Sequence, residues 1–357
     1  ANKNMPRVLV PALTTPPARP VGGAVRAFGG ETMGTTWSAK AVLPATVDLP
    51  ALEAMVQRAL DAVVAQMSPW EQLSDLCRYN RAPAGSWVRL PEATLAVLRR
   101  AIEVAEDSDG AFDPTLGALT DLWGFGPRPF SGAPPETSAV PPQRQTRRRK
   151  RLVAQTSGAL AAVAALRETG GWKRLTLDGE ALFQPGGLKL DLNGIAKGFG
   201  VDQAAAALDR AGVKSYLVEV GGELRGTGAK PDGQPWWVEL ERPPSANDAE
   251  KTVVALHDVA VATSGDYRRF FDHDGRRYAH TLDPATGAPV THTTVSVTVL
   301  DKDCMSADAW ATALTVMTPD AAMAFAAKHD LAALIVSRAA SGGLEERLSP
   351  ALRAMLD

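Results

Sequence analysis

The chain has 357 residues, enough for one large or two ordinary domains with a sizeable core. Hydrophobic residues make up 45% of it and charged residues 22%, which are ordinary proportions for a globular protein. A net charge of −2 gives no support for nucleic acid or an anionic membrane as the main partner. No stretch approaches the roughly 18 apolar residues of a transmembrane helix. The two cysteines, Cys77 and Cys304, exclude a disulfide framework and lack zinc-ligand spacing.

Residues 1–24 are predicted to form an extended tail outside the folded domain. Five prolines fall in the first 22 residues, and no apolar core of signal-peptide type is present there. Strands are expected at 25–28 and 35–42, with the pair Gly29-Gly30 interrupting the first one.

Two helices follow in the N-terminal half. Apolar residues recur at a spacing of 3.6 over 51–67, and Ser68-Pro69 should end that helix. A second helix is predicted over 91–107, with Pro91 suited to its first turn.

A mobile basic insertion is expected near residues 131–151. Its first part is rich in proline, serine, threonine and alanine. Arg144 and the run 147–151 then place six positive charges within eight residues. A solvated loop explains this composition, and a docking patch for an acidic partner is the alternative.

The second half alternates hairpins with long helices. In chain order we expect a helix near 158–168, strands near 173–177, 180–184 and 188–192, a helix at 195–211, strands near 215–220, 236–241, 252–256, 259–263, 277–282 and 293–300, helices at 303–317 and 319–329, and a strand at 331–336. This mixture indicates the α+β class and not a doubly wound nucleotide fold. No linker is evident, so one domain is expected.

Asp308 and Thr312 are the strongest candidates for a metal site. They lie four residues apart in a segment of good helix formers, so their oxygens should project from one face. A carboxylate and a hydroxyl so placed suit a hard cation such as Mg²⁺. The structural alternative is a solvated Asp308 and a Thr312 that bonds its own helix.

A glycine-bearing turn between a strand and a helix is the best candidate for a phosphate site. P-loop and Rossmann signatures are absent. Residues 190–200 instead place Asn193-Gly194 before a helix with Lys197 in its first turn. The helix end and the ammonium group would suit a diphosphate, although an ordinary corner with a surface lysine fits equally.

His280 has the best local context for proton transfer among the five histidines. It ends a predicted strand and precedes a Pro/Gly turn, although a lone histidine is more often structural. Glycine turns beside polar groups at 111–117, 220–223 and 262–267 are weaker signals.

Taken in order, these segments resemble the ApbE family of flavin transferases. The resemblance spans roughly 28–336 and is carried by eight motifs, which lie at 31–37, 68–80, 112–117, 191–198, 221–222, 262–267, 280–289 and 307–316. It implies a single compact α+β domain over 25–357, related to the T-fold, with mixed, largely antiparallel sheets and flanking helices.

The resemblance also implies roles for individual residues. Positions that hold FAD in the family are matched by Met33, Trp70, Ala111, Phe112, Asp113, Asp191, Lys197, Gly222 and Leu282. Asn80 matches a position that balances holding FAD against cleaving it. Asp308 and Thr312 match side-chain Mg²⁺ ligands, with main-chain oxygen help expected near residues 194–196 and assigned to Ala196. His280 matches a histidine that assists the transfer.

The implied activity is Mg²⁺-dependent transfer of FMN from FAD to a threonine of an acceptor flavoprotein, with release of AMP. A metal-dependent FAD pyrophosphatase and a non-catalytic flavin-binding protein are the alternatives. The chain departs from the family at Asn193, where a glycine is frequent, and at Cys77, where a serine is frequent. No cysteine precedes Cys77 to carry a lipid, so the periplasm expected from the family and the cytoplasm both stay open.

Overall fold

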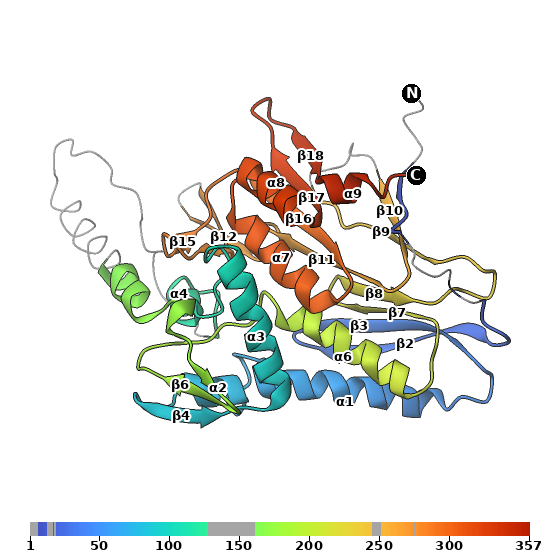
Figure 1. Cartoon of the computed structure of the whole chain (residues 1–357), viewed down its shortest axis with the longest axis horizontal. Helices are drawn as coiled ribbons and strands as arrows, with labels where there is room; N and C mark the ends of the chain where they lie inside the picture. Colours follow the sequence, from blue (N-terminus) through green and yellow to red (C-terminus); the bar gives the residue numbers. More distant parts are fainter. Residues whose placement is uncertain (1–5, 13–16, 18, 128–160, 245–250, 274–275) are drawn as a thin grey trace. The chain divides into compact units, whose positions relative to one another are not determined.

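The computed structural model describes residues 6–12, 17, 19–127, 161–244, 251–273 and 276–357. The predicted α+β class and its largely antiparallel sheets are confirmed (Figure 1). Residue contacts cluster in two compact units: unit 1 comprises Ala1–Ser68, Leu192–Tyr267 and His292–Asp357, and unit 2 comprises Pro69–Asp191 and Arg268–Thr291. The basic insertion expected near 131–151 lies outside the described residues. Within the described ranges, no helix has both the length and the apolar character needed to span a membrane.

Unit 1 is built on an eight-stranded antiparallel sheet of order β18-β17-β16-β11-β8-β7-β3-β2. In chain order the strands are β2 (Ala24–Thr32), β3 (Thr35–Leu43), β7 (Tyr216–Val220), β8 (Glu223–Thr227), β11 (Val259–Gly265), β16 (Thr294–Asp301), β17 (Ala332–Arg338) and β18 (Leu344–Leu348). Strand β16 is buried along nearly its whole length. Such burial is typical of a strand covered on both faces.

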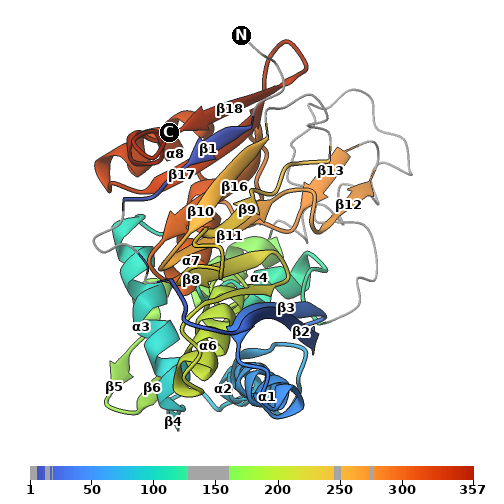
Figure 2. The ribbon, with the colours of Figure 1, turned by 90° about the vertical axis from the view of Figure 1, so that its right-hand side faces the viewer.

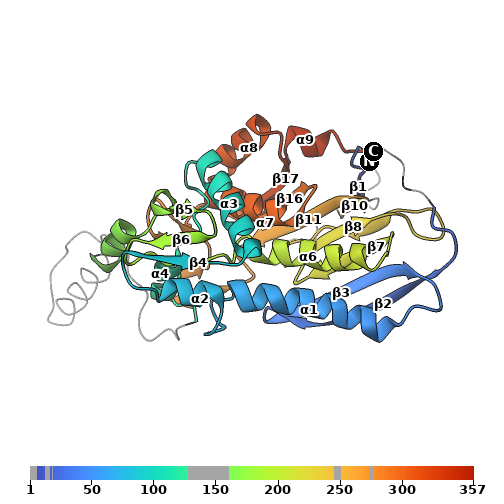
Figure 3. The same cartoon turned by 60° about the horizontal axis from the view of Figure 1, so that its bottom comes forward.

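Helices cover one face of this sheet. They are α1 (Leu49–Met67), α6 (Ala196–Arg210), α7 (Cys304–Val316) and α8 (Pro319–Lys328). Figure 3 shows α1 and α6 side by side along the strands. Trp37 on β3, Val56 on α1 and Leu208 on α6 meet in the core between these layers. The apolar stripe predicted for 51–67 is the face that α1 buries.

A three-stranded sheet of order β1-β10-β9 belongs to the same unit (Figure 2). Its strands are β1 (Arg7–Leu9), β9 (Trp236–Glu239) and β10 (Thr252–Leu256). β1 lies within the segment expected to be a tail, where it pairs with β10 in parallel. Leu9 is fully buried with Val254 and Leu256, and this apolar contact explains why the segment joins the fold.

Strand β2 does not break at Gly29-Gly30, contrary to the prediction. It continues to Thr32 because the glycines allow close packing, not a bend. A Cβ at Gly29 would lie 2.4 Å from the Trp37 carbonyl oxygen, and one at Gly30 would lie 2.6 Å from Gln57 Oε1. A side chain at either position would therefore collide with its neighbours.

Unit 2 combines short elements. They are α2 (Asp75–Asn80), β4 (Ser86–Arg89), α3 (Glu92–Asp107), α4 (Gly117–Leu122), helical residues 161–169, a 3₁₀ turn (Trp172–Arg174), β5 (Leu177–Asp178), β6 (Ala181–Gln184), β12 (Phe270–His273), β13 (Arg276–Ala279), β14 (Leu282–Asp283) and β15 (Ala288–Pro289). The strand predicted at 188–192 is absent and the one at 173–177 is largely replaced by the 3₁₀ turn. The side chain of Asn80 takes the main-chain hydrogen bonds of Leu190.

Candidate functional site

Asp308 and Thr312 lie on α7, as their spacing predicted. The Asp308 side chain is not a solvated charge, because the residue is only 4% exposed. Thr312 Oγ1 lies 3.4 Å from the Gly194 carbonyl oxygen and 3.3 Å from Ser264 Oγ. Both structural alternatives considered for this pair are therefore wrong, since Thr312 bonds outside its own helix.

The name oxygen cluster is used here for the Gly194 carbonyl and the hydroxyls of Thr312 and Ser264, which lie together, and for the Asp308 carboxylate one helical turn before Thr312 on α7. Such an all-oxygen donor set suits Mg²⁺. Across the described ranges no group of three or more His, Cys, Asp or Glu side chains is arranged to hold a metal. A cation here would therefore depend on one carboxylate with neutral oxygens. The main-chain oxygen near Thr312 belongs to Gly194. A main-chain metal ligand at Ala196 stays a prediction.

Packing between α6 and α7 fixes the Asp308 carboxylate. Asp308 Oδ2 accepts a 2.9 Å hydrogen bond from the main-chain N–H of Gly198 in the first turn of α6. A Cβ at Gly198 would lie 2.2 Å from the Cys304 carbonyl oxygen, so only glycine allows this approach. Asp202, on α6, accepts from the N–H groups of Cys304 and Met305 at 3.1 and 2.9 Å, which fixes the start of α7.

Lys197 stands in the first turn of α6 and forms a buried ion pair. Its Nζ lies 2.8 Å from Oε2 of Glu223, which is fully buried while the Lys197 side chain is 31% exposed. Burying the Glu223 carboxylate without a cation would cost free energy of folding. The ion pair therefore holds the Lys197 ammonium group in place. Glu223 follows the Gly221-Gly222 turn, whose glycines both have positive φ.

Met33 occupies the turn of the β2–β3 hairpin in an unusual conformation. Its φ is 50° and that of Gly34 is 70°, as a two-residue turn of this hand requires. A non-glycine residue in this region costs on the order of 1–3 kcal/mol. A Cβ at Gly200 would lie 2.7 Å from Met33 Cε, so the Met33 side chain packs closely on α6.

In unit 2, Asn80 binds the main chain before Asp191. Its Nδ2 donates to the Leu190 carbonyl at 3.0 Å and its Oδ1 accepts from the Leu190 N–H at 2.7 Å. The amide thus replaces a neighbouring strand, which explains the missing strand at 188–192. Asp191 Oδ2 accepts from Thr120 Oγ1 at 2.7 Å, and its N–H donates to the Pro114 carbonyl at 2.8 Å.

The turn at Ala111–Asp113 is held by its own carboxylate. Asp113 Oδ1 accepts from the Thr115 N–H and hydroxyl at 2.8 and 2.6 Å, and its Oδ2 accepts from the Trp172 N–H at 3.3 Å. Burial raises the pKa of Asp113, and these hydrogen bonds oppose the shift. Phe112 is buried.

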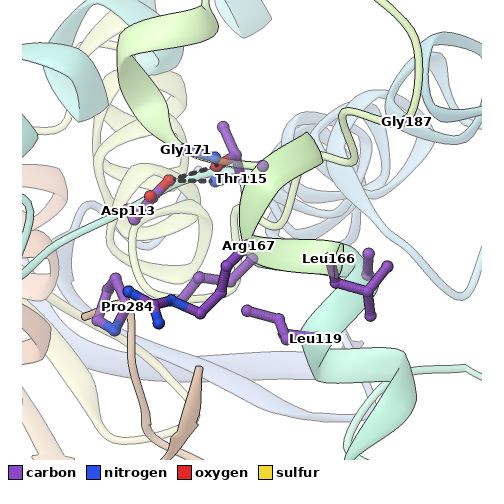
Figure 4. Close-up of a pocket in the computed structure, with 11 residues that line it drawn as sticks. Asp113, Thr115, Leu119, Leu166, Arg167, Gly171, Gly187 and Pro284 are labelled. Atoms are coloured by element: carbon purple, nitrogen blue, oxygen red, sulfur yellow. Dashed lines mark hydrogen bonds between the residues drawn. The ribbon is translucent and has the colours of Figure 1, made fainter. Parts of the chain in front are cut away.

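Asp113 and Thr115 line a cavity of about 140 Å³ with Arg167 and Pro284 (Figure 4). Figure 4 also shows Gly171 bonded to Thr115 at its edge. Sites for small molecules typically measure roughly 300–1,000 Å³. This cavity alone is therefore too small for a flavin dinucleotide.

His280 follows β13 and is bonded back to that hairpin. Its Nδ1 lies 3.0 Å from the Arg269 carbonyl oxygen. Trp70 is 47% exposed, and the Arg269 guanidinium lies 5.4 Å from its ring centroid. Leu282 is 4% exposed and packs with Trp123 and Phe125, so its side chain is part of the core.

Several residues that hold these groups were not predicted from the sequence. Ser264 and Glu223 stood in motifs noted only as polar glycine turns, and that pattern was the available signal. Asp202 and Arg269 carried no local signal, because their partners lie far away in the sequence or on the main chain.

The comparisons with known proteins agree with this architecture. The model of the ApbE family matches residues 33–335. An FAD:protein FMN transferase of Vibrio cholerae is 37% identical over 317 residues, which cover 88% of each chain, and one of Escherichia coli K12 is 30% identical over 328 residues, covering 90% of this chain and 87% of that protein. The crystal structure of the Pseudomonas stutzeri flavinyl transferase ApbE in its apo form is 36% identical with a TM-score of 0.81, covering 94% of this chain and 97% of that one.

Proposed function

The chain belongs to the ApbE family and is an FAD:protein FMN transferase, and we propose that its reaction is Mg²⁺-dependent. In this proposal FMN moves from FAD to a threonine hydroxyl of an acceptor flavoprotein, and AMP is released. The observation that carries it is the oxygen cluster, in which a buried carboxylate stands one helical turn from a hydroxyl that contacts two further neutral oxygens. That donor set fits a hard cation of the kind phosphate substrates require.

Asp308 and Thr312 would hold the metal through their side chains, with the Gly194 carbonyl adding a main-chain oxygen. Mg²⁺, when bound, supplies neutralisation of phosphate charge and polarisation of a phosphoryl oxygen. The Gly198 N–H keeps the Asp308 carboxylate oriented before any ligand arrives. This preorganisation lowers the cost of assembling the site.

The other residues bind substrate and move a proton. Lys197, fixed by Glu223, offers a cation to the diphosphate of FAD. Trp70 presents an exposed aromatic face suited to a flat ring system. The acceptor hydroxyl oxygen forms a bond to the FMN phosphorus while the phosphorus–oxygen bond to AMP breaks. His280 accepts the hydroxyl proton.

One incubation tests the proposal. Purified protein is mixed with FAD and Mg²⁺, with and without a peptide that has one accessible threonine. AMP is quantified and the peptide mass is measured. AMP that forms only with peptide, together with an FMN adduct on the threonine, supports the transferase. FMN and AMP without an adduct would identify a pyrophosphatase, and intact bound FAD would identify a flavin-binding protein.

A further inference from the structure

Arg269 contacts two separate parts of unit 2 through its side chain. Its guanidinium lies over the Trp70 ring, 5.4 Å from the centroid, which is within the range of a cation–π interaction. Its Nη2 also donates a 2.7 Å hydrogen bond to the Phe125 carbonyl. One planar cation therefore connects the exposed tryptophan to the loop after α4. A lysine could not satisfy both contacts with the same geometry.

The main chain of Arg269 makes a second pair of contacts, both with His280. Its carbonyl oxygen accepts from the His280 main-chain N–H at 3.0 Å and lies 3.0 Å from the ring Nδ1. A carbonyl oxygen can only accept, so Nδ1 must carry the proton in this contact. In the neutral ring the lone pair is then on Nε2, which is the nitrogen left to act as a base.

We propose that Arg269 is a positioning residue that fixes both the Nδ1–H tautomer of His280 and the orientation of the Trp70 ring. The anchored side chain restrains its own carbonyl, and that carbonyl restrains the imidazole. The edge of the Phe125 ring adds a second restraint, since it meets His280 at a centroid distance of 6.3 Å and an angle of 69°. The role in turnover rests on the proposed transferase function, whereas the tautomer assignment rests on the geometry alone.

A matched control lies in the same hairpin. Arg277 also places its guanidinium over an aromatic ring, that of Phe270 at 3.7 Å, and forms an ion pair with Asp272 at 3.3 Å. None of these contacts involves Trp70, Phe125 or His280. Arg277→Met therefore removes an arginine and a cation–π contact without disturbing the proposed anchor.

The test compares Arg269→Met and Arg277→Met in the full chain by two measurements. Steady-state transfer separates kcat from KM for FAD and for the acceptor peptide. Nitrogen-15 NMR of the histidine rings, with His280 assigned through His280→Asn, reports the tautomer directly. We expect Arg269→Met to lower kcat about 10–100-fold, since small misplacements of a reacting group cost rates of this order. KM for FAD should rise severalfold, KM for the peptide should stay within about twofold, and His280 should become a mixture of tautomers.

Arg277→Met should leave all of these quantities within about twofold of the parent protein. If Arg269→Met does not fold, Arg269→Lys is measured instead, with a smaller fall in kcat and a smaller change in tautomer. Wild-type kcat and a retained Nδ1–H tautomer in the Arg269 variant would overturn the proposal. If the parent protein transfers no FMN, the transferase function fails, while the NMR comparison still decides whether Arg269 sets the tautomer.

Discussion

The proposed metal ligands in unit 1 lie mainly on regular elements, whereas the proposed flavin contacts of unit 2 lie largely on turns and loops. Asp308 and Thr312 lie on one helix, and Ser264 is on a strand of the large sheet. In unit 2, Asn80 orders residues around Leu190, and the Arg269 carbonyl orders His280. The first group depends on packing between helices, while the second depends on pairs of hydrogen bonds between separate segments.

This difference predicts how each region responds to substitution. A change in the oxygen cluster should alter ligand chemistry while leaving the fold intact, because α6 and α7 share a buried core. A change in the loops of unit 2 should alter geometry and stability together, since each lost hydrogen bond frees a main-chain segment. Substitutions in the two regions therefore separate these two kinds of effect.

Asp308→Asn should have the largest effect among changes to the oxygen cluster. The amide keeps an oxygen for the Gly198 N–H but removes the charge proposed to hold the cation. We expect transfer to fall about 10³-fold, because several kcal/mol of charge stabilisation correspond to that factor. Thr312→Val removes only a neutral oxygen ligand and should lower the rate of transfer about tenfold. The measurement is the AMP release rate across a Mg²⁺ titration.

Asp303→Ala is the control on the same helix. Asp303 caps α7 by accepting from the Ser306 N–H at 2.8 Å, so its loss should cost about 1 kcal/mol of stability. Its effect on the AMP release rate should be within about twofold. A wild-type rate for Asp308→Asn at limiting Mg²⁺ would show that the carboxylate only caps α6.

His280→Asn tests whether unit 2 takes part in chemistry or only in binding. Asparagine retains an N–H donor close to the position of Nδ1 but has no nitrogen in place of Nε2. Loss of a positioned proton acceptor should slow transfer about 10²–10⁴-fold. The affinity for FAD, measured by fluorescence titration, should change by less than about twofold. Full activity would remove the histidine from the mechanism and leave unit 2 with binding alone.

Local patterns predicted most regular elements and the shared helix of Asp308 and Thr312, whose role as metal ligands stays a prediction. The 3.6-residue stripe marked α1, and the spacing of Asp308 and Thr312 placed both on α7. The same reasoning failed at Gly29-Gly30, because their role depends on Trp37 and Gln57 across the hairpin and helix. A local rule treats paired glycines as a break and has no information about such neighbours.

The anchors of unit 2 could not be predicted for a related reason. Asn80 and Leu190 are 110 residues apart. Nothing in the sequence around Leu190 indicates that a distant side chain takes the place of a neighbouring strand. The contact between Arg269 and His280 uses a carbonyl group, which every residue has. Long-range bonds to the main chain leave no mark on residue spacing, so only the folded structure reveals them.

Asn80→Asp should lower the free energy of unfolding, because it removes a hydrogen-bond donor to the main chain. The new carboxylate still accepts from the Leu190 N–H but faces the Leu190 carbonyl with a second acceptor. Leaving that buried carbonyl without its donor should cost about 1–3 kcal/mol in urea unfolding. Arg99→Ala, which breaks an exposed ion pair with Glu92 on α3, should cost less than about 0.5 kcal/mol. Equal costs for the two variants would mean that the Asn80 contacts are not structural.

The smallest effect concerns the pH dependence of the Asp113 turn. Burial raises the pKa of this carboxyl in the folded protein above its value in the unfolded chain. The folded state therefore binds the proton more tightly, and the contribution of Asp113 to stability is greatest below about pH 4. It is lost as pH rises through the folded pKa, where the buried group must ionise. Asp113→Asn removes this titration, so the stability of the parent protein relative to the variant should fall as pH rises from about 4. Urea unfolding of both proteins at several pH values measures that difference, and a constant difference would show that the hydrogen bonds from Thr115 and Trp172 fully offset burial.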